Sequence, residues 1–157
     1  MIERSVGKNH RCLSKTKEKL MEITCKKVEE GNIRSFIPQT PDGYLLFEKV
    51  HIIPSYTPWD CYLVKECQSK VNFLRSKGID CHWAREHSER IHVALGTGPN
   101  CRARQGDYEL PPVGYLFVKI DQEKEALMAL PKMYEEEKRY TAEILAGKNP
   151  APLKWHC

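Results

Sequence analysis

The sequence predicts an α+β protein with a mainly antiparallel sheet and two or three helices packed on it. Two observations carry this prediction. Apolar residues recur at helical spacing in three stretches, and runs rich in β-branched and aromatic residues stand between them. The expected order is helix, two strands, helix, two strands, helix, which is typical of a sheet with helices on one side. We expect one α+β domain over residues 1–147 and a C-terminal tail over 148–157.

The composition is that of an ordinary globular protein. Of the 157 residues, 41% are hydrophobic and 29% charged, and no apolar run is long enough to cross a membrane. The N-terminus lacks the apolar stretch of a secretion signal, so we expect an intracellular protein, cytoplasmic or nuclear, without a membrane partner. The seven cysteines form no CxxC pair and are expected to be reduced thiols. The net charge of +4 permits an anionic partner, such as RNA or a nucleotide, but does not require one.

The first part of the chain predicts a helix and a hairpin. Residues 14–30 combine apolar positions at helical spacing with lysines and glutamates, and Gly31 follows as a C-terminal cap. The apolar run 33–37 and the longer stretch 44–53 predict two strands. The turn between them contains Asp-Gly, which favours a hairpin.

The central helix has the clearest signals. Thr57 is a suitable cap, Pro58 stands at the first helical position, and Asp60 completes a capping box. Apolar residues continue at helical spacing from Trp59 to Leu74, before Gly78.

The second half predicts two strands and a helix. Residues 79–89 are polar and rich in histidine, and a strand follows from residue 90. After the loop 97–112, the nearly continuous apolar run 113–120 predicts a central strand. Asp121 is a suitable cap for a helix that Pro131 interrupts and that resumes as far as Gly147.

The stretch 90–101 is the most plausible place for chemistry. A strand holds His92 on the face opposite Ile91, and a glycine-rich loop follows it. A histidine facing a cleft suits acid or base work on a phosphodiester, and Thr97 with the backbone of residues 96–98 can donate hydrogen bonds to a phosphate. Arginines 90, 102 and 104 add positive charge. The plainer alternative is a histidine with only a structural role in the sheet.

Residues 90–97, Arg-Ile-His-Val-Ala-Leu-Gly-Thr, resemble the second histidine motif of the 2H phosphoesterase superfamily. The likeness is to the 2′,3′-cyclic-nucleotide phosphodiesterase branch and to the cyclic phosphodiesterase domain of fungal tRNA ligases. His92, Leu95, Gly96 and Thr97 match the motif. Ala94 stands where the family has threonine or serine, so Thr97 would replace that contact. A member that binds a nucleotide without cutting it fits this difference as well as an enzyme does.

The resemblance implies a metal-independent phosphodiesterase with no cofactor, acting on cyclic phosphates of nucleotides or RNA ends. His51 is the best partner histidine because it also lies in an apolar strand. The pair would exchange protons with the 2′ oxygen and the attacking water. The implied site consists of the catalytic residues His51 and His92 and of the phosphate-binding residues Arg90, Ala94, Gly96, Thr97, Arg102, Arg104 and Tyr115.

Two other functions stay open on the residues alone. Cys81, His82, His87 and Cys101 are possible zinc ligands, which favours a non-enzymatic interaction or adaptor module with a protein partner. The alternative is a basic RNA-binding domain that uses the lysine-rich residues 14–30 and the arginines.

Overall fold

The computed structural model describes residues 21–53, 58–95 and 104–156, with the side chains of all of these except 92–95 and 104–108. These residues form an antiparallel sheet with two helices packed on it, which confirms the predicted α+β class. None of the helices in this part of the chain is long and apolar enough to span a membrane. In chain order the elements are β1 (Cys25–Glu30), β2 (Ile33–Pro38), β3 (Tyr44–His51), α2 (Trp59–Ser76), β4 (Cys81–Leu95), β5 (Arg104–Glu109), β6 (Val113–Lys119), the short 3-10 helix η2 (Ile120–Gln122) and α3 (Glu123–Leu145).

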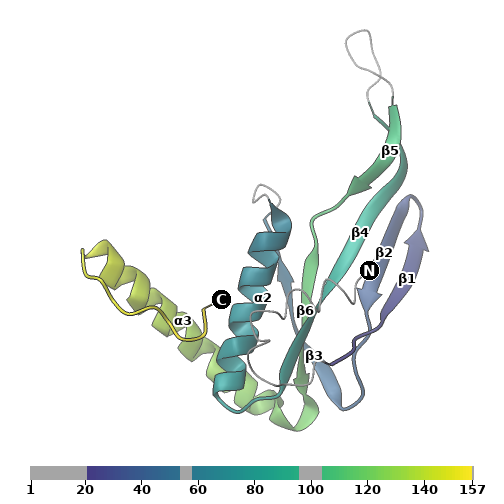
Figure 1. Cartoon of the computed structure of the whole chain (residues 1–157). Helices are drawn as coiled ribbons and strands as arrows, with labels where there is room; N and C mark the ends of the chain where they lie inside the picture. Colours follow the sequence, from purple (N-terminus) through teal and green to yellow (C-terminus); the bar gives the residue numbers. More distant parts are fainter. Residues whose placement is uncertain (1–20, 54–57, 96–103, 157) are drawn as a thin grey trace.

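The sheet is built around β4. The strand order is β1-β2-β4-β6-β3, and β5 pairs with the distal half of β4 (Figure 1). Residues 81–86 of β4 pair with β6, while residues 87–90 pair with β2. β6 has partners on both sides, so residues 113–119 of the predicted strand 113–120 form a central strand. β4 therefore links the core of the protein to the outer strands without an intervening loop.

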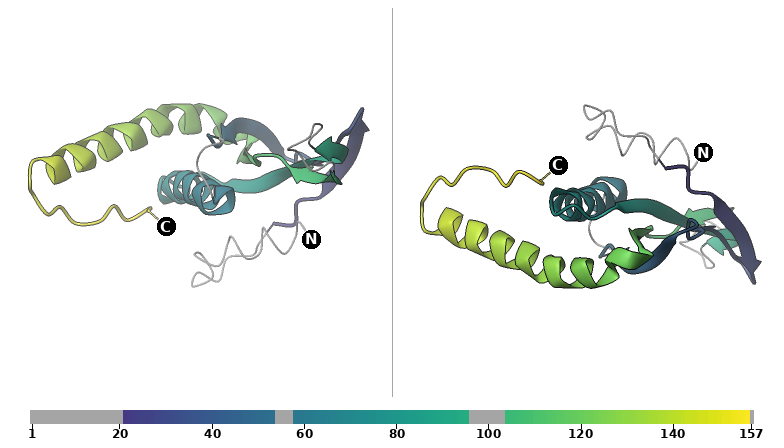
Figure 2. Two further views of the ribbon diagram at one scale, coloured as in Figure 1. Left: turned by 90° about the horizontal axis from the view of Figure 1, so that it is seen from above. Right: turned by 90° about the horizontal axis from the view of Figure 1, so that it is seen from below.

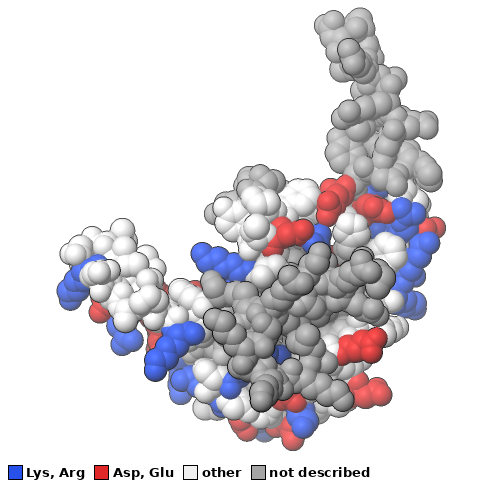
Figure 3. All heavy atoms as spheres, viewed as in Figure 1, with Lys and Arg blue, Asp and Glu red and all other residues white. Residues whose placement is uncertain are grey.

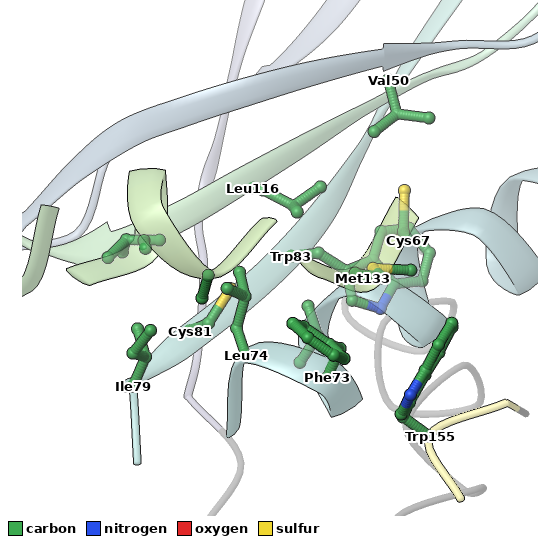
Figure 4. Close-up of a cluster of buried hydrophobic side chains, with 14 of the residues drawn as sticks. Val50, Cys67, Phe73, Leu74, Ile79, Cys81, Trp83, Leu116, Met133 and Trp155 are labelled. Carbon is green, nitrogen blue, oxygen red and sulfur yellow. The ribbon is translucent and has the colours of Figure 1, made fainter. Parts of the chain in front are cut away.

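The main core lies between one face of the sheet and the helices. Trp83 of β4 and Leu116 of β6 are fully buried there against Leu74 of α2 and Met133 of α3 (Figure 4). Because side chains alternate along a strand, their neighbours point to the opposite face. That face carries a second, smaller buried cluster made of Ile23, Ala84, Tyr115 and Phe117.

The C-terminal segment returns from the far end of α3 toward α2 (Figure 2). Trp155 ends up buried, with its ring edge-on to Phe73 at a centroid distance of 5.4 Å. Its indole N–H donates a hydrogen bond of 3.3 Å to Glu136 of α3. The predicted tail thus contributes a side chain to the core.

The predicted helix over residues 14–30 is wrong in its described part. Residues 25–30 form β1, which pairs with β2 in continuous antiparallel register, and residues 14–20 lie outside the described residues. Gly31, interpreted as a helix cap, lies instead in the two-residue turn between these strands, with a φ of 61°. The spacing of apolar residues is compatible with a helix and with a strand, and pairing with β2 selects the strand.

Residues 33–38 and 44–51 are strands but do not form the predicted hairpin. β2 pairs with β4 and β3 pairs with β6, so two strands lie between them. The polar residues 81–89 belong to β4, and β5 lies within the predicted loop 97–112. Hydrogen bonds to a neighbouring strand hold both segments in an extended conformation. The hydrophobic pattern of the sequence does not reveal this pairing.

The helices agree better with the sequence. α2 begins at Trp59 and ends shortly before Gly78, whose φ is 80°. The start differs by one residue from the prediction, because Pro58 is the N-cap and not the first helical residue. Thr57, the predicted cap, lies outside the described residues. α3 has Gln122 as its N-cap and not Asp121, which lies in η2. The helix is continuous through Pro131, where the sequence predicts an interruption. Pro131 lies on the exposed side of the helix, where water can satisfy the carbonyl left free by its missing N–H.

Candidate functional site

The distal ends of β4 and β5 form a two-stranded arm that extends past the neighbouring strands (Figure 1). Pairing of β4 with β2 ends where Arg90 faces Ile33, and the N–H of Ile91 donates a last hydrogen bond of 2.8 Å to Asn32. Beyond this point the described residues of β4 and β5 pair only with each other. We call residues 91–95 and 104–107 the arm.

His92 lies in a β-bulge at the base of the arm. The register of β4 against β5 shifts between Arg90, which faces Tyr108, and Val93, which faces Gly106. Two residues of β4 therefore stand opposite one residue of β5. Bulges of this kind bend a strand and redirect its side chains, and they are frequent next to functional sites.

The structure does not bring the two predicted catalytic histidines together. His51 is exposed at the end of β3 and faces Val113, which in turn faces Glu86 of β4. His92 lies six residues beyond Glu86 in the same strand, which is about 20 Å at the usual rise per residue. Two histidines that exchange protons at one phosphate must both reach it, and this register gives that mechanism no support.

Tyr115 is not available as a phosphate donor. It is 5% exposed, its hydroxyl donates a hydrogen bond to Glu86, and the Nζ of Lys49 lies 5.0 Å from the centre of its ring. Burial and the Glu86 carboxylate raise the pKa of Tyr115. Phe117 on the same face is fully buried, so these two rings form no open surface for stacking bases.

The other predicted phosphate-binding residues gather on the arm and its base. Arg90 is exposed at the base, while Arg104 faces Leu95 and Ala94 faces Gln105 within the arm. Gly96, Thr97 and Arg102 lie outside the described residues, between the two strands in sequence. The described part of this set therefore belongs to one hairpin.

The proposed zinc ligands are not brought together either. Cys81 points into the main core, where burial raises the pKa of its thiol to about 12, and His82 points to the opposite face. The ring of His87 lies 3.8 Å from a carboxylate oxygen of Glu89, and Cys101 lies outside the described residues. The described ranges contain no cluster of three or more histidine, cysteine or acidic side chains able to hold a metal ion.

Sequence reasoning missed a polar network at the start of β4. The Nε2 of His82 lies 2.9 Å from Asp80, whose other oxygen accepts a hydrogen bond of 2.5 Å from the hydroxyl of Tyr44. The Nδ1 of His82 lies 3.2 Å from the guanidinium of Arg75. A guanidinium only donates, so Nδ1 accepts and Nε2 carries the proton. The network joins β3, α2 and β4, and both ring nitrogens of His82 are occupied; the Asp-x-His spacing was its one signal in the sequence.

Comparisons of the chain with protein-family models, curated proteins and solved structures found no match. The arm and its base are thus the candidate site on geometry alone. They hold an exposed arginine, a bulged histidine and a second arginine on paired strands.

Proposed function

We propose that the chain binds RNA through its phosphates, using the arm and Arg90 at its base, and that it does not cleave the RNA. The observation that carries this proposal is the projection of a two-stranded hairpin beyond the core, with Arg104 on one strand and Arg90 at its base. Arginine suits this role because its planar guanidinium is always charged and matches a phosphate with two parallel hydrogen bonds.

The projection of the arm is itself an argument for binding. A two-stranded ribbon alone is marginal in water, and beyond Arg90 the described part of β4 pairs only with β5. A ribbon can lie across a phosphate backbone, where a thick domain would be excluded; the narrow major groove of A-form RNA would not admit it, which favours contacts to phosphates. We therefore assign the arm to recognition.

The charge of the chain is distributed in a way that suits binding by local contacts. Residues 1–20 contain six lysines or arginines and two glutamates, which equals the whole net charge of +4. Residues 21–157 carry equal numbers of basic and acidic side chains, so this part of the chain has no general attraction for polyanions. Arginines 90, 102 and 104 lie close together in the sequence, but Glu89, Asp107 and Glu109 stand beside them, so binding would depend on individual arginine–phosphate contacts and not on a patch of net positive charge.

Removal of two arginines tests the proposal. The double variant Arg90→Gln, Arg104→Gln should bind labelled RNA oligonucleotides more weakly, by a similar factor for every sequence, because phosphate contacts carry no sequence information. The plot of log affinity against log salt concentration should lose about one unit of slope for each arginine removed. Fluorescence anisotropy at several salt concentrations measures both quantities.

The matched control is Lys132→Gln, Arg139→Gln, which removes two exposed charges from α3. This control should leave affinity and salt slope close to those of the unaltered protein. Equal losses in both double variants would show that binding depends on total charge and would overturn the role of the arm. DNA of the same sequence shows whether the 2′-hydroxyl contributes.

Assays with 2′,3′-cyclic nucleotides separate binding from cleavage. Because the register separates His51 from His92, we expect no hydrolysis above that of a sample carrying both His51→Ala and His92→Ala. Liberation of the 2′- or 3′-phosphate is followed by chromatography with protein free of nuclease. Turnover that each single histidine variant abolishes would establish the paired-histidine mechanism and contradict our proposal.

A further inference from the structure

Within the part of the chain that the structure describes, β1 is an edge strand with an open side. It is the first strand in the sheet order, and among the described residues it pairs only with β2. Its sequence is Cys-Lys-Lys-Val-Glu-Glu, and all four charged side chains are exposed. Charged side chains of both signs lie along this edge of the molecule (Figure 3). Edges of this kind are templates for pairing with another strand unless something blocks them.

The geometry of the turn between β1 and β2 determines which backbone groups of β1 face away from β2. Glu30 and Ile33 flank the two-residue turn and are bonded to each other, and the N–H of Gln39 donates to Thr24 at 2.8 Å. Because bonded and non-bonded pairs alternate in an antiparallel ladder, even-numbered residues of β1 bond to β2. The N–H and C=O groups of Lys27 and Glu29 therefore point to the open side.

We propose that β1 pairs with β1 of a second copy of this chain, antiparallel, with Val28 on the two-fold axis. In this register Lys27 faces Glu29 of the second copy and Lys26 faces Glu30, each twice. Lys27 and Glu29 also present the free backbone groups to each other. The order of charges along β1, positive-positive-neutral-negative-negative, is complementary to itself when one strand is reversed. The inference is independent of RNA binding by the arm.

Other registers are unfavourable. A shift by one residue places outward backbone groups opposite inward ones, so the ladder cannot form. Shifts by two residues place Lys27 opposite Lys27 or Glu29 opposite Glu29, and like charges directly opposite are destabilising. Within one chain Glu29 already lies 3.5 Å from Lys27 and 3.9 Å from Arg34. Pairing thus adds partners to charges that are exposed in the monomer.

The contact involves one short strand from each copy. The surface that it buries is therefore expected to be smaller than the roughly 1,200 Å² that a stable interface needs. We therefore expect a monomer–dimer equilibrium that shifts with protein concentration and that salt weakens. Sedimentation velocity over a concentration series measures it.

Charge reversal gives the decisive experiment. Lys27→Glu places glutamate opposite glutamate, and Glu29→Lys places lysine opposite lysine, so each variant alone should stay monomeric. A mixture of the two variants restores two opposite-charge pairs and should form a heterodimer. The double variant Lys27→Glu, Glu29→Lys should self-associate like the unaltered protein.

Lys65→Glu, an exposed charge reversal on α2, is the control and should leave the equilibrium unchanged. Thermal melting confirms that each variant is folded. Single variants that still dimerise, or a mixture that stays monomeric, would overturn the proposed register. An unaltered protein that is monomeric at all accessible concentrations would overturn the dimer itself.

Discussion

At the scale of single residues, the direction of a side chain decides what its chemistry can do. Cys81 and His82 are adjacent, yet the thiol lies in the core and the imidazole in a polar network on the other face. Strand alternation separates them as effectively as distance would. Adjacent positions in a strand are therefore poor candidates for ligands of the same zinc ion, because their side chains lie on opposite faces of the sheet.

Gly114 offers a test of packing at this scale. A Cβ atom added there would overlap the sulfur of Cys67 and lie 3.2 Å from Cδ1 of Leu63, so Gly114→Ala overpacks the core between β6 and α2. We expect a loss of about 1–3 kcal/mol in the free energy of unfolding. Urea denaturation followed by circular dichroism measures this loss.

Cys67→Ala provides the compensating change. It removes the sulfur that the new methyl group would meet, so the double variant should be more stable than the sum of the two single effects predicts. A coupling above about 0.5 kcal/mol is expected for residues in contact. Strict additivity would mean that the methyl group is accommodated elsewhere.

At the scale of elements, those with local signals are predictable and those held by pairing are not. α2 carries Pro58 and Gly78 at its ends, and β6 is almost continuously apolar, so both follow from the sequence. β1 is polar, and the first half of β4 mixes buried apolar residues with polar ones. The extended conformation of each depends on pairing with another strand, which for β4 is the remote strand β6. The hairpin expected between β2 and β3 is wrong for the same reason.

The junction of α2, α3 and the C-terminal segment should respond to pH. Burial and the Glu66 carboxylate raise the pKa of Glu137, while His156, at 3.8 Å, lowers it. A raised pKa means that the folded state holds the proton more tightly than the unfolded state does. The resulting stabilisation is present below about pH 4, near the unfolded value, and is lost as pH rises through the folded pKa.

Glu137→Gln should therefore increase the free energy of unfolding at pH 7 and have little effect at pH 3.5. The side chain is 38% exposed, so solvent screening limits the gain to less than about 1 kcal/mol. Chemical denaturation at the two pH values measures it. Glu135→Gln, exposed on the same helix, is the control. A gain of equal size at both pH values would contradict the assigned cause.

At the scale of the whole molecule, the sequence indicates one stretch of the candidate site but not which other residues lie beside it. The stretch 90–101 stands out by its histidine and glycines, and its described part forms the base and one strand of the arm. The pairing of His92 with His51 depends on which strands are neighbours. That choice is made by the complete sheet, in which β6 separates β3 from β4.

The continuity of β4 also has a mechanical consequence. Its first residues are bonded to β6 in the core, and its last residues form the arm. Hydrogen bonds of an antiparallel ladder run perpendicular to the strands. A pull on the arm along the strand axis therefore loads many of these bonds at once, in shear, and does not break them one by one. A force applied to the described part of the arm would therefore be transmitted to β6 and the core through the ladder as a whole.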